Sequence, residues 1–499
     1  MKTSRAILLS FQVILGYSVG CLGHNDYEFP KSFDFGAVTA SFAIEGGWNA
    51  DGKGESVWDF ITHEIPEIVE AESGANYNIT KAAEVAADSY HRFEEDIKAA
   101  KEIGLNFYRF SISWTRILPH GFNFHVNQAG IDYYNKLIDA IIAANVTPVA
   151  TLLHYDSPAV GDPFLGGFSN ELAVQCFVDY ADLVFGLFGD RIRYWITFNA
   201  PSKLCNEFPR KILAKNSKYF PTGIYEYTCA HNVIKAHAKT YRLYESKYKT
   251  SQKGLLSISL ELTWHEPASN SKEDIEAASR AMDFTFGWFA HPLIHGNYPK
   301  SMIHTIGELS KKQNFTSSRL SKFTPEEIIN IKGTLDYFCV GPMQTYLTSA
   351  NKEIPKIPST NTDGQYSVQV NKSWIDPNNF YTNTPWGFRK ALNYVWNSYG
   401  HKQISITEHG YAALDDSLND SYRIDFMKKY LEQVLLLIHE DKVDIGSYSV
   451  LSLIDIFYFE YALKIKFGLV QVDFNNNEFP RTPKNSAKYY TQVIKNRKL

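Results

Sequence analysis

The sequence predicts an α/β protein folded as a single (β/α)8 TIM barrel with long loops on its C-terminal face. Eight short apolar segments alternate along the chain with amphipathic helical segments. Each apolar segment is followed by a helix or a long loop, which is typical of a closed parallel barrel. An open doubly wound sheet usually carries a glycine-rich turn after its first strand, and the segment from Ala43 to Asn49 does not fit that pattern.

The predicted elements follow one another in a regular order. Strands are expected at residues 36–41, 107–114, 147–153, 194–199, 255–260, 337–341, 404–408 and 445–451. Helices are expected at residues 82–103, 128–144, 170–188, 225–248, 271–294, 386–399 and 421–440. Residues 301–335 and 350–380 are polar, so we expect them to form long excursions above the barrel.

The composition is that of a soluble globular protein. The chain has 499 residues, of which 44% are hydrophobic and 21% are charged, and these fractions exclude a disordered or collagen-like chain. The formal net charge is −4, from 50 basic and 54 acidic residues, which argues against nucleic acid as a partner. The sequence holds no His-Glu-x-x-His, Cys-x-x-Cys or phosphate-loop motif, so no metal or cofactor is expected.

The N-terminus has the pattern of a secretory signal peptide. Lys2 and Arg5 precede an apolar run over residues 6–19, and small residues near positions 20–23 offer cleavage points. The run is short for a membrane span, which leaves a membrane anchor as the weaker alternative. We therefore expect residues 1–23 to be removed, residues 24–499 to form one domain without a membrane span, and the mature protein to be secreted.

Secretion would place the chain in a compartment where disulfides and N-glycans form. Cys205 and Cys229 flank one segment and are a candidate pair, but their spacing does not decide whether they bond. Motifs for N-glycosylation agree with secretion and occur at Asn78, Asn314, Asn371 and Asn419.

Functional side chains of such a barrel lie at the C-terminal ends of the strands. Glu408 closes the seventh predicted strand, and because an unpaired carboxylate is costly to bury, it is either a site residue or one half of an ion pair. Arg109, inside the second strand, needs an acidic partner, and Glu408 is the natural candidate. Asn199 closes the fourth strand. His154 follows the third strand and is either a site residue or a hydrogen-bonded core histidine.

Several longer motifs, in one order along the chain, resemble glycoside hydrolase family 1, the family of β-glucosidases and myrosinases. They lie at residues 42–46, 108–119, 289–292, 467–474 and 481–487. The resemblance is greatest to insect members and covers about residues 33–490, nearly all of the mature chain. It implies a single (β/α)8 barrel.

The family hydrolyses glycosides with two carboxylates about 5–5.5 Å apart, a nucleophile and an acid/base. By resemblance, Glu408 in Ile-Thr-Glu-His-Gly stands at the nucleophile position. The acid/base is the fourth residue of the family motif Thr-Phe-Asn-Glu-Pro, and that residue is Ala200 here. A methyl group cannot protonate a leaving group, and losing a general acid costs about 10²–10⁴ in rate. Plant myrosinases carry Gln at this position, because a glucosinolate leaving group needs no protonation.

Most positions that contact the sugar in the family also differ in this chain. Arg109, His154, Asn199 and Glu408 are retained. The family's Gln, Tyr, Glu and Trp side chains are replaced, by resemblance, at Ala43, Tyr155, Met343, Leu451, Tyr458 and Phe459. Since recognition of sugar hydroxyls needs buried polar groups, these exchanges should abolish it. Apolar replacements prevail, so we expect a cavity adapted to a less polar ligand.

Three functions are compatible with these residues. The first is a secreted pseudo-glycosidase that binds a small ligand of low polarity, or a protein partner, without hydrolysis. The second is an enzyme repurposed for lyase, isomerase or cyclase chemistry on an apolar substrate, with a protonated Glu408 as general acid. The third is a residual β-glucosidase or thioglucosidase restricted to activated leaving groups. A relaxed site that binds nothing is the alternative to all three, because apolar filling also preserves packing.

Overall fold

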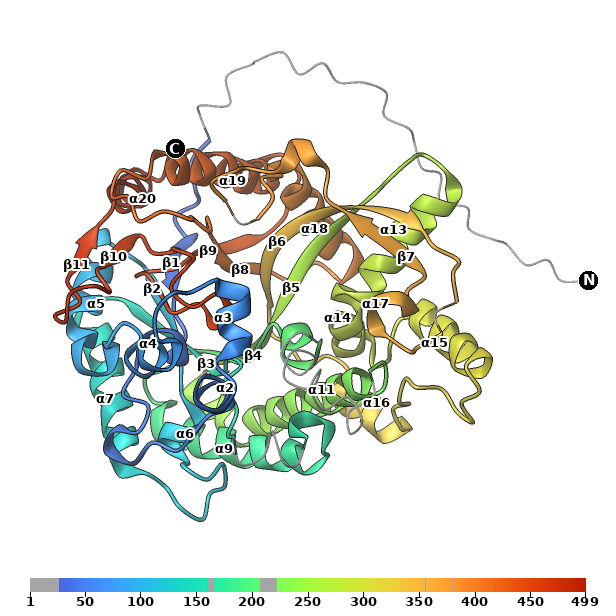
Figure 1. Cartoon of the computed structure of the whole chain (residues 1–499), viewed down its shortest axis with the longest axis horizontal. Coiled ribbons are helices and arrows are strands. Elements are labelled where there is room, and N and C mark those ends of the chain that lie inside the picture. Colours follow the sequence, from blue (N-terminus) through green and yellow to red (C-terminus); the bar gives the residue numbers. More distant parts are fainter. Residues whose placement is uncertain (1–26, 160–165, 207–221, 355, 380) are drawn as a thin grey trace, which may run out of the picture.

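A closed ring of parallel strands forms the centre of the molecule (Figure 1). The computed structural model describes residues 27–159, 166–206, 222–354, 356–379 and 381–499, so the predicted signal peptide lies outside the described residues. The strand order is β5-β4-β3-β2-β1-β9-β8-β6, and pairing of β5 with β6 closes the ring. Every pair in the ring is parallel, which confirms the predicted (β/α)8 barrel.

The barrel strands lie close to their predicted positions. They are β1 Asp34–Val38, β2 Phe107–Ser111, β3 Thr147–Leu153, β4 Tyr194–Asn199, β5 Leu255–Pro267, β6 Phe338–Ala350, β8 Ile404–His409 and β9 Ile445–Leu451. β5 and β6 run well beyond their predicted ends at residues 260 and 341 and pair with each other along this extension. A strand that the sequence did not predict, β7 Tyr366–Gln369, pairs antiparallel with the extended β6. The short strands β10 Val470–Val472 and β11 Arg481–Pro483 form a separate antiparallel pair.

Helices surround the ring and pack their apolar faces toward it (Figure 1). The longer ones are α5 Ser89–Ile103, α7 Gln128–Ala143, α9 Leu172–Phe188, α11 Tyr225–Leu243, α13 Lys272–Phe284, α14 Phe286–His295, α15 Lys300–Lys312, α18 Pro385–Ser398, α19 Ser421–His439 and α20 Asn485–Asn496. The shorter ones are α1 Ser41–Ile44, α2 Val57–Glu64, α3 Glu67–Ser73, α4 Ile79–Val85, α6 Trp114–Ile117, α12 Lys249–Gln252, α16 Pro325–Ile331 and α17 Thr360–Asp363.

Two predicted helices are broken by local backbone geometry. The helix predicted at residues 82–103 divides into α4 and α5, because Ala86 and Asp88 between them adopt positive φ angles of 47° and 53°. The helix predicted at residues 271–294 divides at Thr285, whose φ and ψ of −103° and −88° are not helical. Residues 301–335, expected as an excursion, contain α15 and α16, and a capping box between Thr324 and Glu327 starts α16.

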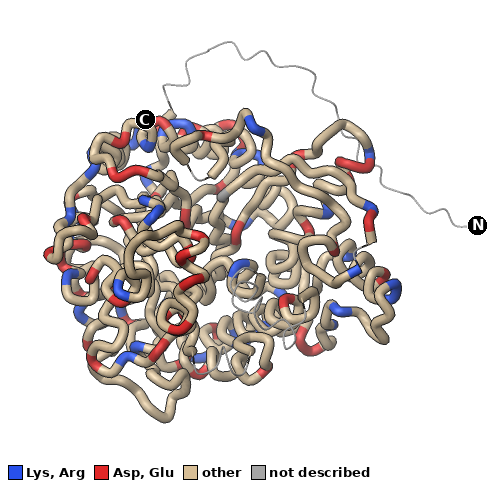
Figure 2. Tube along the Cα trace, viewed as in Figure 1, with Lys and Arg blue, Asp and Glu red and all other residues tan. Residues whose placement is uncertain are grey.

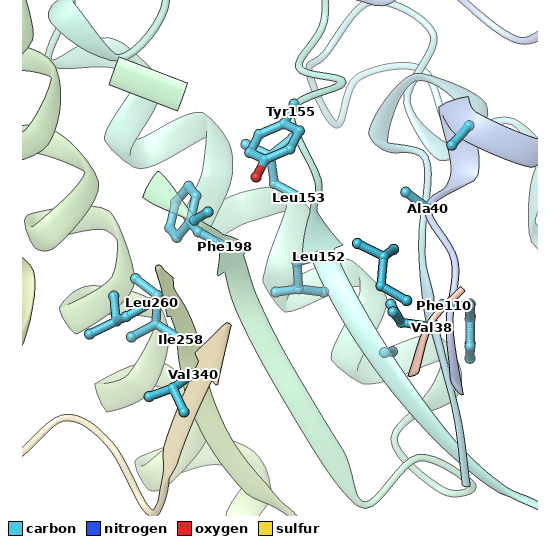
Figure 3. Packing of buried hydrophobic residues seen from close by; sticks show 14 of the residues in the cluster. Val38, Ala40, Phe110, Leu152, Leu153, Tyr155, Phe198, Ile258, Leu260 and Val340 are labelled. Atoms are coloured by element: carbon cyan, nitrogen blue, oxygen red, sulfur yellow. The ribbon is translucent and has the colours of Figure 1, made fainter. Parts of the chain in front are cut away.

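Side chains alternate between the interior of the barrel and the surrounding helices. On β2, Phe107 and Arg109 face the interior, whereas Tyr108 and Phe110 belong to the core between strands and helices. Figure 3 shows members of the hydrophobic core, among them Phe110 of β2 and Phe198 of β4. A buried Arg109 thus follows from strand geometry, since its neighbours on both sides must face the helices.

Charges of both signs are interspersed over the outer elements (Figure 2), as the small net charge suggests. In the described part of the chain, no helix is both long and apolar enough for a bilayer. Three of the predicted glycosylation positions, Asn78, Asn314 and Asn419, are exposed, and Asn371 is partly exposed. Their modification stays a prediction.

Cys205 and Cys229 form a disulfide bond. Cys205 lies in the helical turn that follows β4, and Cys229 lies in α11, so the bond ties the C-terminal end of a barrel strand to the next helix. Cys176 and Cys339 are free among the described cysteines. The bond closes a loop with a sequence separation of 24 residues, which restricts the unfolded chain.

Replacing both Cys205 and Cys229 by Ser should lower the free energy of unfolding by about 2–4 kcal/mol, because the unfolded chain regains loop entropy. Denaturant unfolding with the disulfides kept oxidised measures the change. Cys176→Ser is the matched control, since this thiol is free and partly exposed, and it should change stability little. Equal stability of the double variant and the wild type would show that the bond contributes nothing.

Candidate functional site

A buried arginine joins the retained polar residues at the C-terminal half of the barrel. Arg109 of β2 is 0% exposed, and its Nη1 lies 3.0 Å from Oε1 of Glu408 on β8. Its Nη2 donates to Oδ1 of Asn199, the last residue of β4, at 2.7 Å, and its Nε donates to Thr151 Oγ1 at 3.0 Å. The ion pair expected between Arg109 and Glu408 is therefore present, and it connects β2 with β8 across the interior, past β1 and β9.

His154 is tied into the same network. Asn199 Nδ2 donates to His154 Nε2 at 2.9 Å, and Glu408 Oε1 lies 3.7 Å from that nitrogen. Burial, and then the positive charges of Arg109 and Lys203, lower the pKa of His154 well below its usual value. The imidazole is thus neutral and accepts a hydrogen bond at Nε2. It is both a hydrogen-bonded core histidine and a wall of the candidate site, so the two sequence-based interpretations are compatible.

A small cavity, which we call the upper cavity, lies beside Glu408 at the C-terminal ends of the strands. The residues predicted for the site that line it are Ala43, His154, Tyr155, Asn199, Ala200, Glu408, Leu451, Tyr458 and Phe459. The prediction for Met343 falls on a side chain outside the described part of the structure. The cavity volume is about 30 Å³, whereas pockets for small organic ligands measure about 300–1,000 Å³. This volume suits one or two waters rather than a sugar ring.

The aromatic ring of Phe459 forms part of the wall of the upper cavity. Its ring packs against Tyr155 at 5.2 Å, Trp58 at 5.1 Å and Phe42 at 5.9 Å between centroids, and it stacks on His154 at 6.1 Å. Such aromatic contacts fix the ring in place beyond simple burial. The exchange expected at this position therefore removes a hydrogen-bond donor, while an aromatic ring still packs there.

Three residues of the upper cavity have a left-handed backbone. Tyr155, Ala200 and Phe459 have φ angles of 75°, 34° and 42°. For residues other than glycine this region costs about 1–3 kcal/mol each and persists only where the surrounding structure imposes it. Ala200 is held by its N–H, which donates to Ser259 O at 2.9 Å. Although its methyl group offers no chemistry, Ala200 thus keeps an unusual backbone conformation.

Two charged residues of the upper cavity were not among the predicted site residues. Lys203 Nζ lies 3.9 Å from Glu261 Oε1, and Ser202 Oγ donates to Glu261 Oε2 at 3.1 Å. Glu261 directly follows the apolar strand segment at residues 255–260, just as Glu408 closes its own strand. The reasoning that identified Glu408 would therefore also have identified Glu261. The upper cavity is therefore less uniformly apolar than the sequence suggested.

Asp156 lies next to the wall of the upper cavity. It follows Tyr155, is buried, and accepts a hydrogen bond from Ser41 Oγ at 2.7 Å. Burial raises its pKa to about 6. The folded protein therefore favours the protonated acid at mildly acidic pH.

No described residues suggest a metal site. In the parts of the chain that the structure describes, no three His, Cys, Asp or Glu side chains are grouped as ligands. The expectation that the protein uses no metal or cofactor remains a prediction.

Glu408→Ala should lower the free energy of unfolding by about 2–4 kcal/mol, because it leaves the guanidinium of Arg109 buried without its carboxylate. Asp425→Ala is the matched control. It removes an ion pair of 2.6 Å with Lys429 whose side chains are 60% and 48% exposed, and solvent screens such pairs, so stability should change little. Denaturant unfolding compares the two, and equal losses would contradict a structural role for the buried pair.

The pH dependence of stability should report on Asp156. Its folded pKa is above the unfolded value, so its favourable contribution is present below about pH 4 and is lost as the pH rises through about 6. Between pH 4 and 7 the wild type should thus lose about 2–3 kcal/mol of its free energy of unfolding relative to Asp156→Asn. Unfolding curves of both proteins across this range measure it, and a constant difference would show that Asp156 titrates normally.

Comparisons with known proteins agree with this geometry. The model of Glycosyl hydrolase family 1 matches residues 25–499. Myrosinase 1 of Brevicoryne brassicae is 40% identical over 94% of this chain and 99% of its own, and the cytosolic β-glucosidase of Homo sapiens is 38% identical over 94% and 99%. The solved structure of aphid myrosinase has a TM-score of 0.88 at 39% identity, over 94% of this chain and 99% of its own. A β-glucosidase from the fungus Humicola insolens, in complex with glucose, has a TM-score of 0.84 at 32% identity over 94% and 99%. The chain therefore belongs to glycosyl hydrolase family 1.

Proposed function

We propose that this protein is a secreted member of glycosyl hydrolase family 1 that binds a ligand or partner and does not hydrolyse glycosides. The observation that carries the proposal is Ala200. It lines the same cavity as Glu408, at the end of β4, where the family motif has its acid/base glutamate. Without a proton donor there, cleavage of an unactivated glycoside loses about 10²–10⁴ in rate.

The size of the upper cavity supports the same proposal. A volume of about 30 Å³ leaves no room for a hexose beside Glu408 in this conformation. Phe459 is held by several aromatic contacts, so making room for a sugar by moving this ring would require breaking some of them. The missing acid/base side chain and the small volume of the upper cavity therefore both disfavour glycoside hydrolysis.

Glu408 has a structural reason to be retained in such a protein. Its carboxylate neutralises Arg109, which is buried in the barrel and contacts strands on either side. This pairing also argues against the repurposed-acid alternative, because the carboxylate is already engaged by Arg109 at 3.0 Å and by Asn199 at 3.4 Å.

A residual thioglucosidase is the second candidate. It is favoured by the 40% identity to a protein named Myrosinase 1 and by the chemistry of glucosinolates, whose leaving group needs no acid. The upper cavity opposes it, since a thioglucoside carries the same hexose as a β-glucoside.

The test offers the mature protein 2,4-dinitrophenyl β-glucoside, with and without azide, and the glucosinolate sinigrin. We expect release of dinitrophenol and of glucose from sinigrin to equal that of Glu408→Gln in every condition. Azide can replace a missing acid/base by attacking a glycosyl-enzyme, so it reveals a nucleophile that still works. The human cytosolic β-glucosidase serves as the active control.

Two results would overturn the proposal. Azide-dependent release that disappears in Glu408→Gln would show that a glycosyl-enzyme forms and that hydrolysis is only slowed. Turnover of sinigrin without azide would identify a thioglucosidase.

A further inference from the structure

A second and larger cavity opens at the opposite end of the barrel. This lower cavity lies among the N-terminal halves of the barrel strands and has a volume of about 210 Å³, against about 30 Å³ for the upper cavity. Its rim carries Tyr194 and Leu255, which are each 37% exposed, so the cavity is open to solvent. The family resemblance does not point to this end of the molecule, and Arg109 is the one retained polar residue that lines the lower cavity.

One wall of the lower cavity is apolar and aromatic. Phe107 of β2, Val149 of β3 and Ile196 of β4 line it together with Tyr337, which precedes β6. These residues, with Cys339, form a hydrophobic cluster of their own, separate from the main core. Tyr194 and Tyr337 meet edge to face at 6.2 Å between centroids. This wall offers a surface on which an aromatic ring can pack.

The other wall is lined with hydroxyl and amide groups. Ser405 of β8 and Ser447 of β9 are hydrogen-bonded at 2.6 Å, and Thr407 and Gln403 lie on the same side. Asp34 lies at the exposed rim. Serine and threonine hydroxyls both donate and accept, so this wall can satisfy one hydroxyl group of a ligand.

Arg109 closes the inner end of the lower cavity. It lines this cavity and, on its other side, its guanidinium binds Glu408 and Asn199. Its three nitrogens donate to Thr151, Glu408 and Asn199, so recognition of a ligand in the lower cavity rests on the aromatic and hydroxyl walls.

We propose that the lower cavity is a binding site for a small aromatic alcohol, with the ring on the Phe107–Tyr337 wall and the hydroxyl toward Ser405 and Ser447. The volume fits this class, since a cavity of about 150 Å³ accommodates benzene and about 210 Å³ leaves space for a few further atoms. Binding here does not depend on whether the upper cavity hydrolyses glycosides, so the two proposals can fail separately.

Ligand-observed NMR titrations with benzyl alcohol test the proposal, with toluene lacking the hydroxyl and glucose lacking the ring. Benzyl alcohol should bind saturably with a Kd on the order of 1 mM, which is reasonable for so small a ligand. Toluene and glucose should each bind at least about tenfold more weakly, since toluene offers no hydroxyl group to Ser405 and Ser447 and glucose offers no ring to the aromatic wall.

Two variants locate the binding. Ile196→Phe should weaken binding of benzyl alcohol at least tenfold, because the larger side chain fills space beside the apolar wall. If this variant folds poorly, Ser447→Leu replaces it. Ser447 is partly exposed, and its exchange should weaken binding by a similar factor because it removes a hydroxyl group from the polar wall. Ile142→Phe, the same exchange at an exposed position of α7, is the matched control and should bind like the wild type. Circular dichroism and thermal unfolding verify that each variant is folded.

Three results would overturn the proposal. One is the absence of saturable binding to the wild type. Another is equal binding of benzyl alcohol and glucose. The third is loss of binding in Ala200→Leu with retention in Ile196→Phe, because that pattern would put the ligand in the upper cavity.

Discussion

The charge of Arg109, in the middle of the barrel, is the constraint on which the interior depends. A guanidinium without solvent must be neutralised and its N–H groups must find acceptors, or the fold would bear a cost of several kcal/mol. Glu408, Asn199 and Thr151 supply these partners from β8, β4 and β3. Loss of any of them would disturb strands that are far apart in sequence. Retention of these residues is thus explained by packing and charge alone, whatever chemistry the barrel performs.

The residues that lie outside this constraint are the ones that differ from the family pattern. Ala200, Tyr155 and Phe459 carry no charge, so each can change without removing the carboxylate that neutralises Arg109. Phe459 replaces a larger indole yet still packs with Trp58, Phe42 and His154. The family resemblance thus implies a site in which close packing is maintained while hydrogen-bonding capacity is lost.

The sequence predicts the barrel well because each strand combines a short apolar segment with a following helix. The predicted positions of β3, β4 and β9 agree with the structure to the residue. The polar strand β7 could not be found this way, because its residues are mostly exposed and it exists only through pairing with β6. The interruption at Ala86 and Asp88 was also invisible, since neither residue type requires a left-handed backbone.

The site was predictable to the extent that it rests on strand ends. The ion pair between Glu408 and Arg109 could be predicted because both residues are charged and lie in apolar strands. Lys203 was missed because it lies a helical turn beyond the end of β4, and the volume of either cavity depends on rotamers that sequence patterns do not encode. The disulfide between Cys205 and Cys229 required the distance between β4 and α11, which only the folded chain supplies.

Because Arg109 borders both cavities, the two ends of the barrel share one cation. A molecule at the lower end that draws this guanidinium toward itself would weaken the ion pair between Arg109 and Glu408. Thermodynamic reciprocity then requires that a molecule at the upper end that breaks this ion pair strengthen binding at the lower end by an equal factor. Arg109 in this way couples the cavities at the two ends of the barrel.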